Sequence, residues 1–139
     1  MPAEETSGHL TLKTLYGQIK QFPVDQILAI ETVPRSEDAL SRHQFHFLYL
    51  ANRRGDEAIQ IVLAADFALI KEVNQQLQDN GVKDLIQISR TAIINLKQIT
   101  GIIRENRQLY VTIAQRNGVL YLVTRTYLKL MEDGLRLLD

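Results

Sequence analysis

Two arginines in this 139-residue chain are each flanked by hydroxyl side chains, an arrangement suited to binding an anion. The triplets are Ser89-Arg90-Thr91 and Thr124-Arg125-Thr126, and each interrupts a largely apolar stretch where an unpaired charge would be costly to bury. A guanidinium group is a planar fork of donors that matches either the O6 and N7 atoms of guanine or a phosphate. Hydroxyl groups can donate to phosphates without reading base sequence. The triplets therefore indicate positions where the chain is exposed to solvent and can bind an anionic partner.

The sequence alone leaves other roles open for these and neighbouring residues. Arg90 could instead pair with a buried carboxylate such as Glu31 or Asp84, and Arg125 could be a solvated charge in the first turn of a helix. Asn95, within "IINL", is expected to satisfy backbone groups in a turn. The arginines near expected hairpin ends are interpreted as ordinary surface charges or weak phosphate contacts: Arg104, Arg107 and Arg116.

The sequence carries no catalytic or metal-binding signature. It has no GxSxG, P-loop, strand-linked GxGxxG or HExxH motif. His43 and His46 begin an expected strand, so their side chains would point to opposite faces, and the chain has no cysteine. We therefore predict a protein that is not an enzyme and that has no metal site and no cofactor.

Charge is unevenly distributed along the chain, although the formal net charge is zero. Residues 83–129 contain eight Lys/Arg and two Asp/Glu, a balance of +6, whereas residues 1–82 contain seven and eleven, a balance of −4. A basic segment of this kind is typical of surfaces that bind polyanions, and solvated surface charge can produce it as well.

Length and composition indicate a single soluble domain. The chain is long enough to bury one core, and its fractions of 45% hydrophobic and 23% charged residues are ordinary. No apolar run approaches the roughly 20 residues needed to span a bilayer, and the acidic start "MPAEETSGHL" is not a secretory signal. Without cysteine the chain has no redox reason to leave the cytosol. We expect a cytoplasmic protein with no membrane insertion, a disordered leader over residues 1–8 and one domain over residues 9–139.

Alternation with a period of two dominates the chain and predicts a β-rich fold. Strands are expected in the segments "HLTLKTL", "QIKQF", "DQILAIE", "QFHFLYLA", "EAIQIVL", "LIQIS", "ITGIIRE", "RQLYVTI" and "GVLYLV". The polar stretch Thr32–His43 contains a proline and predicts a long loop. Asn117-Gly118 predicts a hairpin turn between the last two strands.

Two segments follow a helical pattern instead. Asp66 is a predicted N-cap, apolar residues then recur on one helical face, and Asn80 and Gly81 supply a left-handed stop. Near the end of the chain, Thr124 is predicted to cap a short helix that Gly134 closes.

The segment "LIQISRTAIINLKQITGI" resembles the signature of LytTR-type DNA-binding domains. In that family an apolar strand leads into a His/Ser-Arg-Ser/Thr turn, then branched apolar residues, an asparagine and a later isoleucine. The matching residues here are Ser89-Arg90-Thr91, Ala92-Ile93-Ile94, Asn95 and Ile99. The segments "DQILAIE", "LAADFALIKEVNQQL" and "GVLYLVTRTYLKLM" are similar to the family's early strand, its single amphipathic helix and its closing strand and tail. The resemblance covers roughly residues 9–137.

The resemblance implies an elongated antiparallel β-sandwich of about ten strands, with one amphipathic helix and a short C-terminal helix. It also implies that loops at one edge enter successive major grooves of double-stranded DNA. Arg90 and Arg125 match the family's DNA-contacting positions, and a third contact falls on His43 or Gln44. Further predicted DNA-binding residues are Ser89, Thr91, Lys97, Thr124 and Thr126.

The resemblance further implies a bacterial transcription regulator of the response-regulator output type. Direct repeats in promoters would be its sites, a homodimer on DNA its assembly, and a receiver domain, a kinase or a membrane protein its signalling partner. The alternative is a LytTR-like module for protein interaction or signal sensing with little DNA binding. The acidic first half of the chain and the unusual Thr32–His43 loop favour that alternative.

Overall fold

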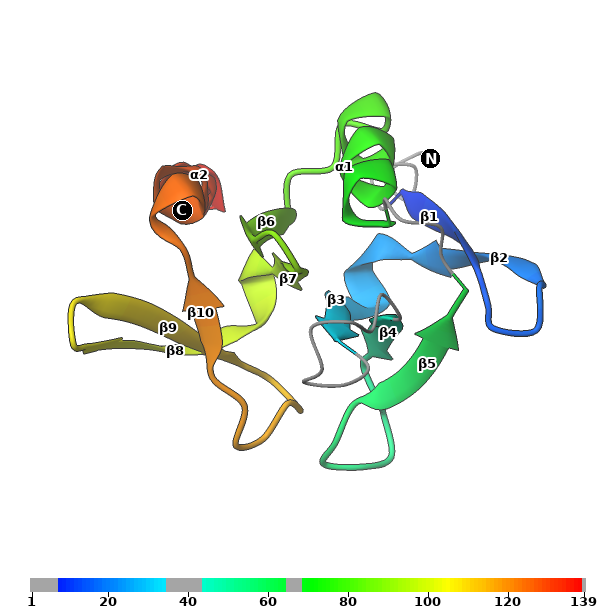
Figure 1. The fold of residues 1–139 in the computed structure, drawn as a ribbon, viewed down its shortest axis with the longest axis horizontal. Coiled ribbons are helices and arrows are strands. Elements are labelled where there is room, and N and C mark those ends of the chain that lie inside the picture. Colours follow the sequence, from blue (N-terminus) through cyan, green and yellow to red (C-terminus); the bar gives the residue numbers. More distant parts are fainter. Residues whose placement is uncertain (1–7, 35–43, 65–68, 139) are drawn as a thin grey trace.

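A computed structural model describes residues 8–34, 44–64 and 69–138, and these form ten strands in three antiparallel sheets together with two α-helices (Figure 1). The elements are β1 (His9–Lys13), β2 (Ile19–Pro23), β3 (Ile27–Pro34), β4 (Gln44–Leu50), β5 (Ile59–Leu63), α1 (Leu69–Asp79), β6 (Leu85–Ser89), β7 (Ala92–Asn95), β8 (Ile99–Glu105), β9 (Gln108–Ile113), β10 (Tyr121–Val123) and α2 (Arg125–Leu138). Two short 3-10 turns, η2 (Val24–Gln26) and η3 (Leu96–Gln98), precede β3 and β8. The predicted mainly β fold is confirmed.

A five-stranded sheet with the order β5-β4-β3-β7-β6 forms the centre of the molecule. Its middle strand, β3, pairs with β4 on one side and with β7 on the other, so that Ile30 lies opposite both Leu48 and Ile93. A three-stranded sheet, β10-β9-β8, and the β1–β2 hairpin complete the β structure.

Both faces of the central sheet are covered by other elements (Figure 1). On one face α1 and the β1–β2 hairpin pack against it, and Leu10 and Val73 contribute to that core with Ile30. On the other face the three-stranded sheet and α2 pack against it, and Val111 and Met131 contribute to a second core. Removing this apolar surface from water on two sides is the main force that holds the layers together.

The strand β7 was not predicted, because its residues carry no alternating pattern. All four positions of Ala92–Asn95 are buried, since β7 lies inside the sheet and the sheet is covered on both faces. A strand in that setting is apolar on both sides and cannot be distinguished by period from another short apolar run.

The predicted left-handed stop of α1 is confirmed. Gly81 has φ +67°, its N–H donates to the Gln78 carbonyl, and the Val82 N–H donates to the Leu77 carbonyl. This pair of bonds is the Schellman arrangement, in which the residue after the helix satisfies its last carbonyls and the next residue packs back on it. Val82 accordingly packs against the core that contains Leu77. The predicted N-cap Asp66 lies outside the described residues.

The prediction that Gly134 ends the C-terminal helix is wrong, because α2 continues through it to Leu138. Gly134 is buried where α2 approaches the central sheet, and a Cβ atom there would lie 2.5 Å from Leu96 Cδ1 and 3.2 Å from Ile86 Cδ1. The glycine permits close packing of the helix and does not terminate it. No helix in the described part of the chain is both long and apolar enough to span a membrane.

We predict that Gly81→Ala lowers the free energy of unfolding by about 1 kcal/mol, because an L side chain disfavours the left-handed backbone conformation at this position. No atom lies within 4 Å of the added Cβ, so steric contact contributes nothing to the loss. Urea unfolding of the variant measures the change. The exposed Gln78→Ala in the same helix is the control and should stay within about 0.5 kcal/mol of wild type. An equal effect of both substitutions would contradict the prediction.

Candidate nucleic-acid interface

The two hydroxyl-arginine-hydroxyl triplets lie side by side, because a backbone hydrogen bond joins Thr124 of the second triplet to Ile88, which precedes the first. The Thr124 N–H donates to the Ile88 carbonyl over 3.0 Å, and the Thr124 hydroxyl donates to the same oxygen over 3.4 Å. This contact brings the end of β10 and the first turn of α2 to the end of β6. Residues far apart in the sequence are thereby placed together at one end of the central sheet.

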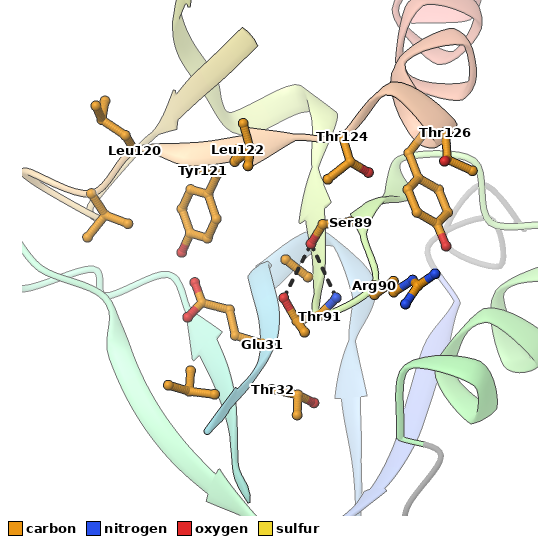
Figure 2. Close-up of a pocket in the computed structure, with 14 residues that line it drawn as sticks. Glu31, Thr32, Ser89, Arg90, Thr91, Leu120, Tyr121, Leu122, Thr124 and Thr126 are labelled. Atoms are coloured by element: carbon orange, nitrogen blue, oxygen red, sulfur yellow. Dashed lines mark hydrogen bonds between the residues drawn. The ribbon is translucent and has the colours of Figure 1, made fainter. Parts of the chain in front are cut away.

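The first triplet forms the turn between β6 and β7 and is held by its own side chains. Ser89 Oγ accepts from the Thr91 N–H over 3.2 Å and lies 3.3 Å from Thr91 Oγ1 (Figure 2). The Thr91 carbonyl accepts from the Thr32 N–H over 2.8 Å, which anchors the turn to β3. Arg90 at the tip is exposed and extends away from Glu31 in Figure 2. Within the described residues it forms no ion pair.

Residues of both triplets line a hollow of about 670 Å³, which we call the hydroxyl-rich hollow. Its lining includes most of the predicted DNA-binding residues, which come from the β6–β7 turn and from the β10–α2 junction: Ser89, Arg90, Thr91, Thr124 and Thr126. The exposed apolar side chains of Leu120 and Leu122 form another part of the wall (Figure 2). The hollow therefore offers hydroxyl groups, one free guanidinium group and an apolar wall, together with the carboxylate of Glu31, which is paired with Arg116.

Arg125 lines a second hollow, of about 520 Å³, which shares the lining residues Leu122 and Thr124 with the first. Arg104 at the end of β8 and Arg107 in the β8–β9 turn line this arginine hollow as well. All three arginines are exposed, and no acidic side chain among the described residues lines the hollow. The two predicted principal contacts, Arg90 and Arg125, thus occupy neighbouring hollows rather than one.

Arg116 does not behave as a surface charge, and that interpretation of it is wrong. Its side chain is only 19% exposed and lies 3.4 Å from the carboxylate of Glu31, which is 13% exposed. Its Nε donates to the Tyr121 hydroxyl over 2.8 Å, and its guanidinium carbon lies 3.6 Å from the centre of the Tyr49 ring. Arg116 therefore connects the β9–β10 segment to β3 and β4 across the gap between the two sheets.

The surroundings of Arg116 favour its charged form. Burial acts to lower the pKa of Arg116, but the hydrogen bond to Tyr121 and the Glu31 carboxylate outweigh burial and raise it. Burial raises the pKa of Tyr121, so its hydroxyl stays protonated while it accepts from Arg116. This cluster is a structural ion pair with aromatic support rather than a free binding site.

The two acids that could have paired with Arg90 are both occupied elsewhere. Glu31 pairs with Arg116, and Asp84 pairs with Lys97 over 3.3 Å. Lys97 is nonetheless 59% exposed and lies in η3, apart from both hollows. This arrangement leaves the guanidinium group of Arg90 free for a partner.

Of the other residues singled out in the sequence, Asn95 has the role that was predicted, whereas His43 and the side chain of Gln44 are not described by the structure. Asn95 satisfies backbone groups as expected, because its Nδ2 donates to the Ile27 carbonyl over 2.9 Å and its Oδ1 accepts from the Lys97 N–H over 2.9 Å. Gln44 begins β4 opposite Pro34, but its side chain is not described, and His43 lies outside the described residues. Among the described residues, no group of three or more His, Asp or Glu side chains is placed to hold a metal ion.

Comparison with family models and with curated proteins gives no match for this chain. Among solved structures, its fold is similar to that of a LytTr DNA-binding domain from Bacillus cereus. The two chains are 17% identical, the TM-score is 0.55, and the alignment covers 91% of this chain and 95% of the other. At this identity the similarity concerns the fold, and it confirms the LytTR-like fold that the sequence resemblance implied.

We predict that alanine substitution of two arginines in the same segment has very different effects on stability. Arg116→Ala should lower the free energy of unfolding by about 2 kcal/mol because it leaves the Glu31 carboxylate unpaired, and partial exposure keeps the loss below that of a fully buried pair. Arg90→Ala should change it by less than about 0.5 kcal/mol, since Arg90 is exposed and unpaired. Chemical denaturation of both variants measures the difference. A large loss for Arg90→Ala would show that this side chain has a structural role.

Proposed function

We propose that this protein binds double-stranded DNA through the hydroxyl-rich hollow and the arginine hollow. The observation that carries the proposal is the convergence of two hydroxyl-arginine-hydroxyl triplets, with unpaired guanidinium groups, at one end of the central sheet. The similar fold of a LytTr DNA-binding domain supports it. Side chains positioned by the strands of packed sheets keep a fixed separation, and recognition of a regular DNA duplex requires such a separation.

The pattern of ion pairs supports a polyanionic partner. Of the eight basic residues in the segment 83–129, Arg116 and Lys97 pair with acids of the domain. The other six form no ion pair within the described residues: Lys83, Arg90, Arg104, Arg107, Arg125 and Lys129. Unneutralised positive charge on one part of a chain with zero net charge attracts phosphate and releases the counterions condensed on DNA.

The chemistry of each group suggests its share of the contact. The exposed guanidinium of Arg90 at the tip of a turn is suited to the O6 and N7 atoms of guanine in a major groove. The hydroxyls of Ser89, Thr91 and Thr126 are suited to phosphate oxygens, which set position without specifying sequence. The exposed Leu122 in the same wall can contact a thymine methyl group.

In the wider role that we propose, the domain over residues 9–139 is the DNA-binding part of a cytoplasmic bacterial transcription regulator. Direct repeats in promoters are its proposed sites, and two copies bind them side by side. A receiver domain, a kinase or a membrane protein supplies the signal. Lys97 and either His43 or Gln44, of which Gln44 begins β4, remain proposed additional contacts to DNA.

We predict that Arg90→Ala and Arg125→Ala each weaken binding to the preferred duplex by about 1–3 kcal/mol, because each removes a guanidinium contact. Arg90→Ala should also reduce discrimination between related duplexes. Mobility-shift titrations against promoter fragments and random duplex DNA measure both effects. Arg53→Ala, which removes an exposed arginine on the β4–β5 connection, is the control and should bind like wild type. Binding of both hollow variants at the wild-type level would contradict the proposed interface.

A protein-interaction module is the second candidate, and the β1–β2 hairpin favours it. Three large apolar side chains at its tip are mostly exposed, with fractions of 55% for Leu15, 91% for Tyr16 and 73% for Ile19. Apolar side chains gathered in this way are common where proteins bind one another. If the wild-type domain binds no duplex DNA even at low salt, the DNA proposal fails and this candidate stands.

A further inference from the structure

The arginine hollow joins side chains from two separate parts of the chain, the β8–β9 hairpin and the start of α2. Arg104 is the penultimate residue of β8, Arg107 lies in the β8–β9 turn, and Arg125 begins α2. Glu105 is adjacent in sequence but does not line the hollow, because successive side chains of a strand point to opposite faces. Like charges brought together without a carboxylate repel one another. A bound anion would relieve that repulsion.

The backbone conformation at Arg107 is a second, independent observation that indicates a functional role for its side chain. Asn106 and Arg107 have φ values of +52° and +66°, so both central residues of the turn adopt the left-handed conformation. Tight hairpin turns of this kind strongly favour asparagine followed by glycine. The chain has Asn117-Gly118 elsewhere, yet it has arginine at the glycine position of this turn. A strained conformation of a residue that is not glycine often marks a functional site.

The N-terminus of α2 adds to the positive potential of the hollow. Arg125 is the first residue of a 14-residue helix, and the unpaired N–H groups of a first helical turn favour anions. The arginine hollow shares the lining residues Leu122 and Thr124 with the hydroxyl-rich hollow. A duplex that contacts Arg90 at the β6–β7 turn would therefore have a neighbouring stretch of its backbone close to the arginine hollow.

We propose that Arg104, Arg107 and Arg125 together bind a backbone phosphate of the DNA, so that the β8–β9 hairpin is a contact separate from the β6–β7 turn. This inference rests on the proposed function. The hairpin contact fixes the position of the duplex and contributes affinity that does not depend on base sequence, whereas Arg90 reads bases. The two turns therefore have different effects on affinity and on specificity.

The test uses Arg107→Gly, which removes the charge and at the same time supplies the residue that the turn favours. The melting temperature of this variant should equal or exceed that of wild type. Its affinity should fall about three- to tenfold on promoter and random duplexes alike. The plot of log affinity against log salt should become less steep by about one unit of slope, as expected for the loss of one phosphate contact. Arg104→Ala should give the same uniform loss, and Arg53→Ala is the charge-matched control.

The possible results separate this inference from the proposed function. If wild type binds DNA and both hairpin variants match Arg53→Ala in affinity and salt slope, the phosphate contact is wrong and the DNA-binding proposal stands. If Arg107→Gly weakens one duplex much more than another, the residue reads bases and the phosphate assignment is again wrong. If wild type binds no duplex DNA at all, the proposed function and this inference fail together.

Discussion

The architecture depends on the burial of β3 and β7 between two cores. Both strands lie inside the five-stranded sheet, and α1 with the β1–β2 hairpin covers one face while the second sheet and α2 cover the other. Polar side chains along these strands would have to be satisfied inside the protein, as Asn95 is by the Ile27 carbonyl. Along β3 and β7, free polar and charged groups can therefore lie only where the strands end. The turns at those ends are where the chain can present donors to another molecule.

Electrostatics separates the arginines into two kinds. Arg116 is neutralised by Glu31 and supported by two tyrosines, so its charge stabilises the contact between the sheets. The arginines at the β6–β7 turn, the β8–β9 turn and the start of α2 have no such partners within the described residues. The same residue type therefore contributes to cohesion at one position and remains available at the others. Burial and the placement of acids decide which role an arginine has.

Much of the fold was predictable because its signals are local. Alternation identified the strands with one exposed face, and Gly81 marked the end of α1 through its need for a positive φ. The strand β7 was missed because every one of its side chains is buried. Gly134 was misinterpreted because glycine also permits close packing, and only the approach of α2 to Leu96 distinguishes that role from a stop.

The candidate site was predictable in part for a similar reason. The repeated hydroxyl-arginine-hydroxyl pattern indicated Ser89–Thr91 and Thr124–Thr126, which the structure brings together. The roles of Arg116 and Arg107 depend on contacts with residues distant in sequence and on a backbone conformation that residue types do not show. The +6 balance of the segment 83–129 was the one sequence feature that pointed to its other arginines as candidate binding residues.

The pairing of β3 with β7 also has a consequence for how the chain acquires its structure. Ile30 lies opposite Ile93, so β3 and β7 can pair only when the long stretch of chain between them forms a closed loop. Contacts between residues so far apart in sequence make folding slow, because closing a long loop costs conformational entropy before the strand pairing stabilises the chain. During synthesis on the ribosome, one edge of β3 stays open until β7 has emerged. In that interval the nascent chain exposes an apolar strand edge that is prone to aggregation and is a natural substrate for chaperones.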